Sequence, residues 1–223
     1  MEIAAALNLD DLERDRLLSA ANFVSIRAPV VPLLAPAQPD SDRMNLQLEC
    51  LQSFSESIAL AVTGAALRGA HVAYWQGPVS RLLYQALQVL RPGIFDEARS
   101  TLLLPSADGQ RLEARYTWGA YAKPRTFATN AGSDGSFMHD LGGAGWAFLT
   151  QEPQLIQDTG SDPRFALSSG PPNFKSILCS PITLNEKCVG VLSFDFKAPT
   201  LTSVDRRLAQ ILAASFAPLV GSV

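Results

Sequence analysis

Two histidines, three cysteines and one group of two aspartates with an arginine are the side chains of this sequence best suited to chemistry. A histidine titrates near neutral pH and can serve as an acid, a base or a metal ligand. His139 stands beside Phe137 after a glycine- and serine-rich stretch, and His71 lies far away in the sequence. One histidine without a second ligand specifies no metal or cofactor. We therefore interpret His139 as a polar loop residue, with catalysis or haem ligation as the alternative.

The three cysteines are an odd number and show no metal-ligand spacing. Cys179 lies in a strand-like run, where a free cysteine is usually a small core residue. Its partner on the next strand is expected near Leu192, well away from Cys188 in register. The sequence therefore predicts neither a disulfide between Cys179 and Cys188 nor a zinc site that includes Cys50.

Asp158, Asp162 and Arg164 form the acidic and basic group. Paired carboxylates beside a cleft can divide the work of acid and base. Asp162 precedes a proline, however, and is well placed to cap a short helix that contains Phe165. We therefore expect this segment to be a turn and not a catalytic centre.

Gly142, Gly143 and Gly145 come directly before Trp146, at the expected start of a helix. A helix N-terminus offers free N–H groups and a positive dipole end to an anion. The segment has neither a Walker lysine nor the glycine spacing of a dinucleotide site. A tight turn into a helix is the preferred interpretation.

Strands and helices alternate through the region that must position these residues. Asp108-Gly109 and Asn185-Glu186 are turn signals between pairs of alternating apolar runs, as in β-hairpins. The strands are expected at 100–104, 111–118, 155–156, 176–182 and 188–194. Residues 119–140 show turn residues and little periodicity, which predicts a long loop. The pattern predicts an α+β sandwich with a central antiparallel sheet.

Helices are expected at 79–90 and 146–150, and again after Thr202 or Ser203, which can cap the last helix. The positions of this last helix expected to face the sheet are Val204, Leu208, Ile211 and Leu212.

The N-terminal third reads as an extension of helices joined by a connector. A short helix is expected around residues 9–18, and the proline-rich stretch 28–42 cannot sustain one. Apolar residues from 44 to 67 recur at steps of three and four, which predicts a helix. This helix can pack on its own domain or pair with its copy in a homodimer, and both interpretations stay open. The predicted division is a helical extension over 1–71 and a domain over 72–223.

Composition limits the classes of function. A net charge of -3 and a pI near 5.4 give no basic surface for direct nucleic-acid binding. The longest apolar stretch, 57–67, is too short to span a membrane. The acidic residues near the start do not suit a signal peptide, so a cytoplasmic location without membrane contact is expected. Apolar residues make up 47% of the chain and charged residues only 17%, so the chain is more apolar than an average soluble protein. Some of these apolar residues can therefore be buried between subunits.

Three consecutive segments resemble a GAF domain. They are GAGWAFLTQEPQLIQDTGSDPRF at 143–165, FKSILCSPITLNEKCVGVLSFDFK at 174–197 and LTSVDRRLAQILAASFAPLV at 201–220. The resemblance implies a GAF/PAS-like antiparallel sheet with flanking helices. It also implies a sensory or regulatory module that binds a small molecule.

The resemblance implies a set of ligand-binding candidates around the loops. His139 stands where cofactor-binding GAF-like domains often close over their pocket, and the loop after Asp158 frequently borders the ligand. Aromatic residues nearby can stack on a ligand or fill the cavity. The candidates are Trp118, Tyr121, Phe137, His139, Trp146, Asp158, Arg164, Phe165 and Cys179.

Several branches of the family fit this chain poorly. GAF-type methionine sulfoxide reductases use cysteines in the pocket loops, and this chain has none between 51 and 178. Lys197 and Asp205 match the cyclic-nucleotide pattern, which would allow an ion pair between them, but the Asn, Phe and Glu of that pattern have changed. Bilin attachment would need a cysteine adjacent to a histidine. Neither a cofactor nor a ligand is therefore identified.

The expected function is a sensor without catalysis that signals to a separate protein or through its flanking helices. Ligand would order residues 119–141 over the sheet and change the angle of those helices. The alternative is a protein-interaction or dimerisation module whose pocket is filled by its own side chains. No nucleic acid is expected among the partners.

Overall fold

The computed structural model describes residues 40–68, 72–94, 97–119, 126–129, 138–165, 174–198 and 201–220. The helix predicted around 9–18 lies outside these residues, as does nearly all of the connector at 28–42. Side chains at 40, 41, 43, 65–68, 72–76 and 138–140 also lie outside the description.

A six-stranded antiparallel sheet forms the centre of the molecule, in the order β3-β2-β1-β6-β5-β4. Both predicted hairpins are confirmed. Asn185 and Glu186 adopt positive φ angles of 50° and 63°, as a tight turn between twisted strands requires. The strands are β1 (Ala98–Pro105), β2 (Arg111–Gly119), β3 (Thr126–Ala128), β4 (Gln154–Ile156), β5 (Ser176–Leu184) and β6 (Lys187–Phe196).

Strand β3 corrects the prediction that residues 119–140 are loop throughout. It pairs with the start of β2, where Leu112 lies opposite Phe127. Three residues are too few for an alternating pattern to be recognised, so only the tertiary pairing identifies this strand.

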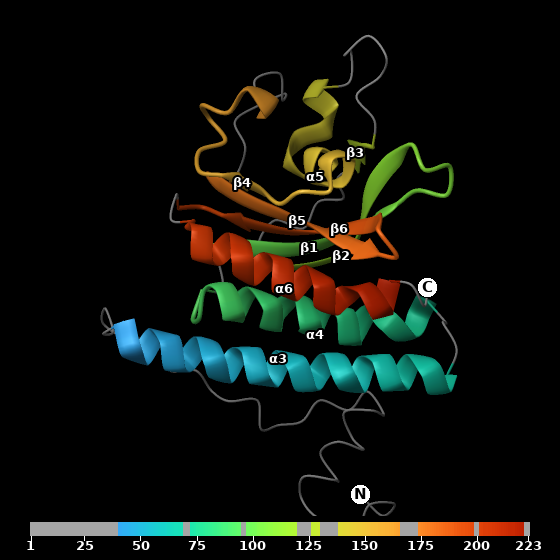
Figure 1. Cartoon of the computed structure of the whole chain (residues 1–223), viewed down its shortest axis with the longest axis vertical. Helices are drawn as coiled ribbons and strands as arrows, with labels where there is room; N and C mark the ends of the chain where they lie inside the picture. Colours follow the sequence, from blue (N-terminus) through green and yellow to red (C-terminus); the bar gives the residue numbers. More distant parts are fainter. Residues whose placement is uncertain are drawn as a thin grey trace, which may run out of the picture.

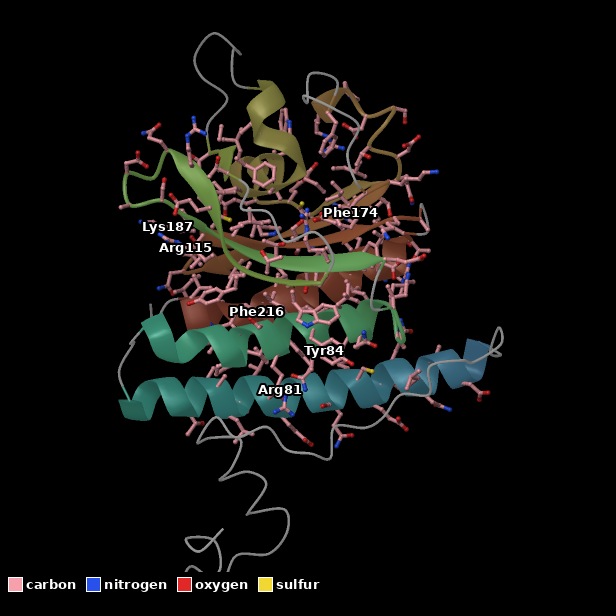
Figure 2. The ribbon with its side chains drawn as sticks, turned by 180° about the vertical axis from the view of Figure 1, so that it is seen from behind. Arg81, Tyr84, Arg115, Phe174, Lys187 and Phe216 are labelled. Carbon is pink, nitrogen blue, oxygen red and sulfur yellow. The ribbon has the colours of Figure 1, made fainter. Side chains whose placement is uncertain are left out.

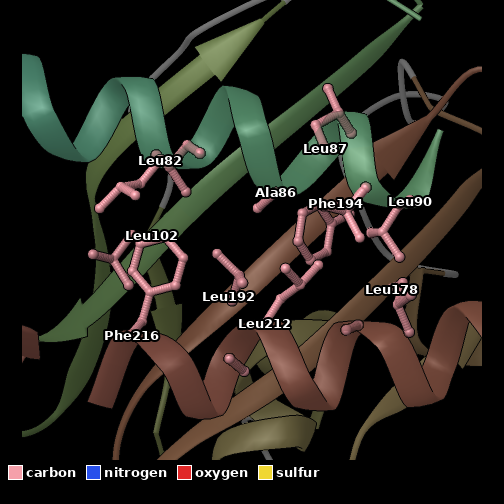
Figure 3. Packing of buried hydrophobic residues seen from close by; sticks show 14 of the residues in the cluster. Leu82, Ala86, Leu87, Leu90, Leu102, Leu178, Leu192, Phe194, Leu212 and Phe216 are labelled. Atoms are coloured by element: carbon pink, nitrogen blue, oxygen red, sulfur yellow. The ribbon is translucent and has the colours of Figure 1, made fainter. Parts of the chain in front are cut away.

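Among the described residues, helices α3, α4 and α6 lie on one side of the sheet (Figure 1). Helices α4 (Val72–Leu90) and α6 (Ser203–Val220) pack directly on the strands, and α3 (Asp40–Arg68) lies beneath them. Figure 3 shows the core between these layers, where leucines of α4 meet Leu192 and Phe194 of β6 and Phe216 of α6. The helix predicted at 44–67 is confirmed as α3, and α4 begins before the predicted residue 79 and continues through Pro78.

Helix α3 packs on its own domain. Phe54 is buried, and its ring centre lies 6.0 Å from that of Phe216. The Gln47 amide nitrogen donates to the Val89 carbonyl oxygen across 3.2 Å, so α3 also binds α4 through a polar contact. The intramolecular interpretation of this helix is therefore confirmed, while pairing with a second copy stays a prediction. Among the described residues, no helix has the length and apolarity that crossing a membrane would require.

The prediction for the sheet-facing side of α6 is confirmed at Leu212, which is buried, and at Leu208, which packs against the core, but it is wrong at Val204 and Ile211. Val204 and Ile211 are 61% and 53% exposed, whereas Ala209, Leu212 and Phe216 are buried. The alanines let the helix approach the strands closely, which the larger side chains would prevent. The predicted cap is confirmed at Thr202, whose hydroxyl accepts from the Asp205 N–H across 3.3 Å.

Helix α5 (Met138–Thr150) and the 3-10 turn η1 (Pro163–Phe165) lie on the other side of the sheet (Figure 1). Helix α5 includes the predicted residues 146–150 but begins earlier. It is kinked at Gly142, where φ is 50° and ψ is -163°. Only glycine adopts such a conformation without strain. A second, smaller apolar cluster forms between α5 and the strands.

Candidate functional site

A small cavity lies between α5 and the sheet. Its volume is about 30 Å³, on a scale where one water needs about 10–15 Å³. Strands β1, β2, β5 and β6 form its floor, while α5, β3 and η1 contribute its roof. The lining residues are Arg99, Thr101, Leu103, Ala114, Thr117, Phe127, Gly143, Ala144, Phe165, Ile177, Cys179, Ser193 and Asp195.

The floor changes in polarity along the strands. Arg99 on β1 lies opposite Asp195 on β6, and Thr101 lies opposite Ser193. The next inward-facing residue of β1 is Leu103. Because alternate residues of a strand face the same side, the floor passes from a charged pair through hydroxyls to an apolar end.

Arg99 and Asp195 form a buried ion pair beneath the cavity. Both Nε and Nη2 of Arg99 donate to Oδ2 of Asp195, the first across 2.7 Å. The Ser193 hydroxyl donates to Oδ1 across 3.1 Å. The guanidinium carbon also lies 4.6 Å from the ring centre of Phe174, which stands on the α5 side of the sheet in Figure 2. Charges buried in this way require partners, and this network supplies them.

Cys179 is the thiol of the cavity and is 1% exposed. Its Sγ donates to the Ser193 hydroxyl oxygen across 3.5 Å. Burial raises the pKa of Cys179 to about 12. Since the thiolate is the reactive form of cysteine, this group is a weak nucleophile at neutral pH.

A thiol titration tests this assignment. We expect the native protein to expose Cys50 and Cys188 to an aromatic disulfide reagent at pH 8, while Cys179 stays protonated and protected. All three cysteines should react after unfolding in guanidinium. The control variant Cys179→Ser should leave the native count unchanged and lower only the unfolded count. Equal native rates for Cys179 and Cys188 would contradict the assignment.

The roof depends on a close approach of α5 to the strands. A Cβ atom at Gly143 would lie 2.8 Å from Cδ1 of Ile156 and 3.3 Å from Sγ of Cys179. The first distance is shorter than a normal carbon contact, so a larger residue would require the Ile156 side chain to shift, and glycine allows the present close packing without that change. Close packing therefore explains Gly143 without an anion-binding role for the glycine cluster.

Arg164 connects η1 to strand β4. Its Nε donates to Asp162 across 2.8 Å, and its Nη1 donates to Oε1 of Gln154 across 2.7 Å. Hydrogen bonds from Arg164 hold the pKa of Asp162 below its ordinary value. Asp162 also accepts from the Arg164 backbone N–H, so the predicted cap is confirmed. These bonds hold Phe165 against the cavity.

The structure brings only part of the predicted site together. Phe165 and Cys179 line the cavity, and Arg164 anchors the turn beside it. Trp118 lies on the opposite face of the sheet, with its ring centre 4.8 Å from that of Tyr84 on α4. It faces away because Thr117, its neighbour along β2, faces the cavity.

The other candidates lie outside the cavity lining or outside the description. Asp158 is exposed, and its Oδ1 accepts from the Gly160 N–H across 3.0 Å. Trp146 lies on α5, and its buried Nε1 has no hydrogen-bond partner among the described residues. Tyr121 and Phe137 lie outside the described residues, as does the side chain of His139.

Sequence reasoning missed the polar floor. Arg99, Thr101, Ser193 and Asp195 stand at alternate positions of two otherwise apolar strands. A charge inside a buried strand was the signal available, because such a residue needs a partner. Within the described part of the chain, no cluster of three His, Cys, Asp or Glu residues could hold a metal ion.

Comparisons with known proteins agree on the fold. The family model described as GAF domain matches residues 78–218. The chain is similar to the free methionine-R-sulfoxide reductase of Neisseria meningitidis in complex with its substrate, with 16% identity, 85% of this chain and 95% of that chain covered, and a TM-score of 0.59. A solved GAF domain gives 19% identity, coverage of 82% and 97%, and a TM-score of 0.56.

The GAF domain of a phosphoenolpyruvate-protein phosphotransferase from Acinetobacter gives 18% identity, coverage of 79% and 93%, and a TM-score of 0.53. No protein with a curated description matches this chain in sequence. Likeness at these identities concerns the fold alone, and a shared fold does not carry a shared activity. Because the family model spans well over half of the chain and solved GAF domains share its architecture, this protein belongs to the GAF domain family.

Proposed function

We propose that this protein is a non-catalytic sensory or regulatory module that binds a small molecule in the cavity between α5 and the sheet. The polar floor is the observation that carries the proposal. A core built only for stability would be expected to fill this space with apolar side chains, since replacing buried ion pairs by packed apolar residues is often neutral or stabilising. Arg99, Asp195, Ser193 and Thr101 instead border open volume.

The absence of catalysis is part of the proposal. Some solved proteins with this fold are enzymes, as the reductase from Neisseria meningitidis illustrates. In this chain, the cysteine that lines the cavity is Cys179, and its raised pKa of about 12 disfavours a thiolate. A sensor needs only differential affinity between two conformations, which the floor can provide without a nucleophile.

Signal transfer would run through the strands to the helices. Ser193 and Asp195 face the cavity, while Leu192 and Phe194 of the same strand pack in the core beside α4 and α6. A displacement of β6 by ligand would therefore shift the side chains that pack against α4 and α6, because packed cores transmit strain. We propose that these helices pass the change to a partner protein or to a second copy of the chain in a homodimer.

A second function has its own supporting observation. The cavity of about 30 Å³ is far smaller than the about 300–1,000 Å³ of typical ligand sites. A domain with so little open space suits an interaction or dimerisation module whose pocket is filled by its own side chains. Ligand retention distinguishes the two functions.

Native mass spectrometry tests the sensor proposal. We expect the full chain, purified without added ligand, to carry a small molecule under gentle conditions and to lose it under denaturing ones. The variant Ala114→Val, which adds two methyl groups to the cavity lining on a strand that favours valine, should reduce the retained fraction at least about tenfold.

The unfolding temperature of Ala114→Val serves as the control. It should stay within about 3 °C of the ligand-free wild type, because the added methyls occupy open space. A wild-type chain that is ligand-free under all conditions and unchanged by Ala114→Val would favour the filled-pocket module.

A further inference from the structure

Thr101 differs from its neighbours Arg99, Ser193 and Asp195 on the cavity floor in that its side chain is not part of their hydrogen-bond network. It is 6% exposed and lines the open volume in the middle of the floor. Its hydroxyl makes no hydrogen bond to any residue that the structure describes. The Thr101 hydroxyl oxygen borders the open volume, so water can reach it. A molecule that displaces this water has to replace its hydrogen bonds.

A second hydroxyl lies beside it. Thr117 is the register partner of Thr101 on β2 and also lines the cavity. Its hydroxyl likewise lacks a partner within the described part of the chain. Each threonine hydroxyl can both donate and accept. Together they form a site for a group that offers both functions.

The charges next to these hydroxyls are already neutralised. The Asp195 carboxylate accepts hydrogen bonds from Arg99 and from Ser193. Its charge at the cavity floor is therefore balanced by the Arg99 guanidinium. Cys179 adds a thiol that is held in its neutral form. An additional net charge over this floor would lose part of its hydration, and the two charged lining residues, Arg99 and Asp195, are already paired with each other. An uncharged occupant avoids that cost.

Size and polarity define the rest of the occupant. A volume of about 30 Å³ corresponds to roughly two or three waters, so the whole occupant is a molecule of only a few non-hydrogen atoms. Beyond the hydroxyls the lining becomes apolar at Leu103, Ala114 and Phe127. The head group should therefore be followed by a short apolar end.

We propose that the cavity binds a small uncharged molecule whose head group donates and accepts hydrogen bonds at Thr101 and Thr117 and whose apolar end lies against Leu103 and Phe127. A primary amide is the simplest head group of this class. The inference rests on the proposed sensor function and specifies the class of ligand for the same cavity.

Amide NMR spectra of the full chain, titrated with matched probes, test this assignment. Propionamide has the required head group, propionate has the same shape with a negative charge, and n-butylammonium carries a positive charge. We expect propionamide to shift the backbone amides around Thr101 and Ser193 in a saturable way. Propionate and n-butylammonium should leave them unchanged.

Variants identify the contact. Thr101→Val keeps the side-chain shape and removes the hydroxyl, and it should weaken propionamide binding by about tenfold or more. Thr117→Val provides a second test should Thr101→Val fail to fold. Thr183→Val is the matched control, because Thr183 is an exposed strand residue outside the cavity, and it should bind as the wild type does.

Two outcomes would overturn the inference. Tighter binding of propionate or n-butylammonium at the same amides would assign a charged ligand and leave the sensor function standing. No shift with any probe, or a propionamide shift unaffected by both threonine variants, would remove the hydroxyl site. Ligand retention in the native mass spectrum would then decide the sensor function separately.

Discussion

Replacing Asp205 with asparagine is expected to lower the free energy of unfolding by about 3–5 kcal/mol. Asp205 is 2% exposed and pairs with Arg91, whose Nη2 donates to Oδ2 across 2.8 Å. The same carboxylate accepts from the Thr202 N–H across 2.6 Å and from its hydroxyl across 2.8 Å. One side chain therefore joins the end of α4 to the start of α6. Asparagine would remove the negative charge that faces a buried guanidinium.

The stability lost in Asp205→Asn should depend on pH, and the shift in the pKa of Asp205 gives the direction of that dependence. Burial alone would raise the pKa of Asp205, but hydrogen bonds from Arg91 and Thr202 lower it below the ordinary value. A carboxyl with a lowered folded-state pKa stabilises the fold above its unfolded-state pKa and loses that contribution as pH falls through the folded-state value. The difference between wild type and Asp205→Asn should therefore be full at pH 7 and shrink below about pH 4.

Urea unfolding at a series of pH values measures this difference. Glu56→Gln is the control, because Glu56 is exposed on α3 and should change stability by less than about 0.5 kcal/mol. A loss of under about 1 kcal/mol for Asp205→Asn at pH 7 would show that the pair is not the connection between the two helices.

Replacing Phe54 with alanine is also expected to cost about 3–5 kcal/mol. Phe54 is among the largest fully buried side chains and belongs to the same core cluster as Leu82, Leu192 and Phe216. Figure 2 shows Phe216 on the helical side of the sheet, where α3 covers it. Loss of the ring would leave a cavity between α3 and α6 that the helices can close only in part.

This variant tests the predicted boundary between residues 71 and 72. A large loss in a single unfolding transition would mean that α3 belongs to the cooperative unit of the GAF domain. Ser55→Ala, at the adjacent exposed position, is the control and should change stability by less than about 0.5 kcal/mol. A small effect of Phe54→Ala, or a separate early transition, would mean that α3 is a detachable extension. Chemical unfolding followed by far-UV circular dichroism measures both.

Local signals explain which elements could be predicted. The Asp108-Gly109 and Asn185-Glu186 turns place both hairpins, because their backbone conformations depend on the turn residues themselves. Apolar periodicity likewise predicts α3, since a helix over many residues repeats its pattern several times. Strand β3 has only three residues, which are too few to show a repeating apolar pattern, and it is identified only by its pairing with β2.

The candidate site was predicted less completely for a related reason. Phe165 and Cys179 were recognised by their place in family-like segments, and both line the cavity. Trp118 was selected as an aromatic residue, but the alternation of β2 turns it toward Tyr84 on the other face of the sheet. The orientation of a strand residue depends on register, which composition cannot provide.

The amino-acid sequence by itself determined the α+β class, the hairpins, the α3 helix and the GAF-like order of segments, because propensity, periodicity and turn chemistry act between near neighbours. Only the tertiary structure decided that Arg99 meets Asp195 and that Thr101 lies beside Thr117. Arg99 and Asp195 are 96 positions apart in the sequence. Strands β1 and β6 bring them together, and such long-range pairing arises only when the whole sheet forms.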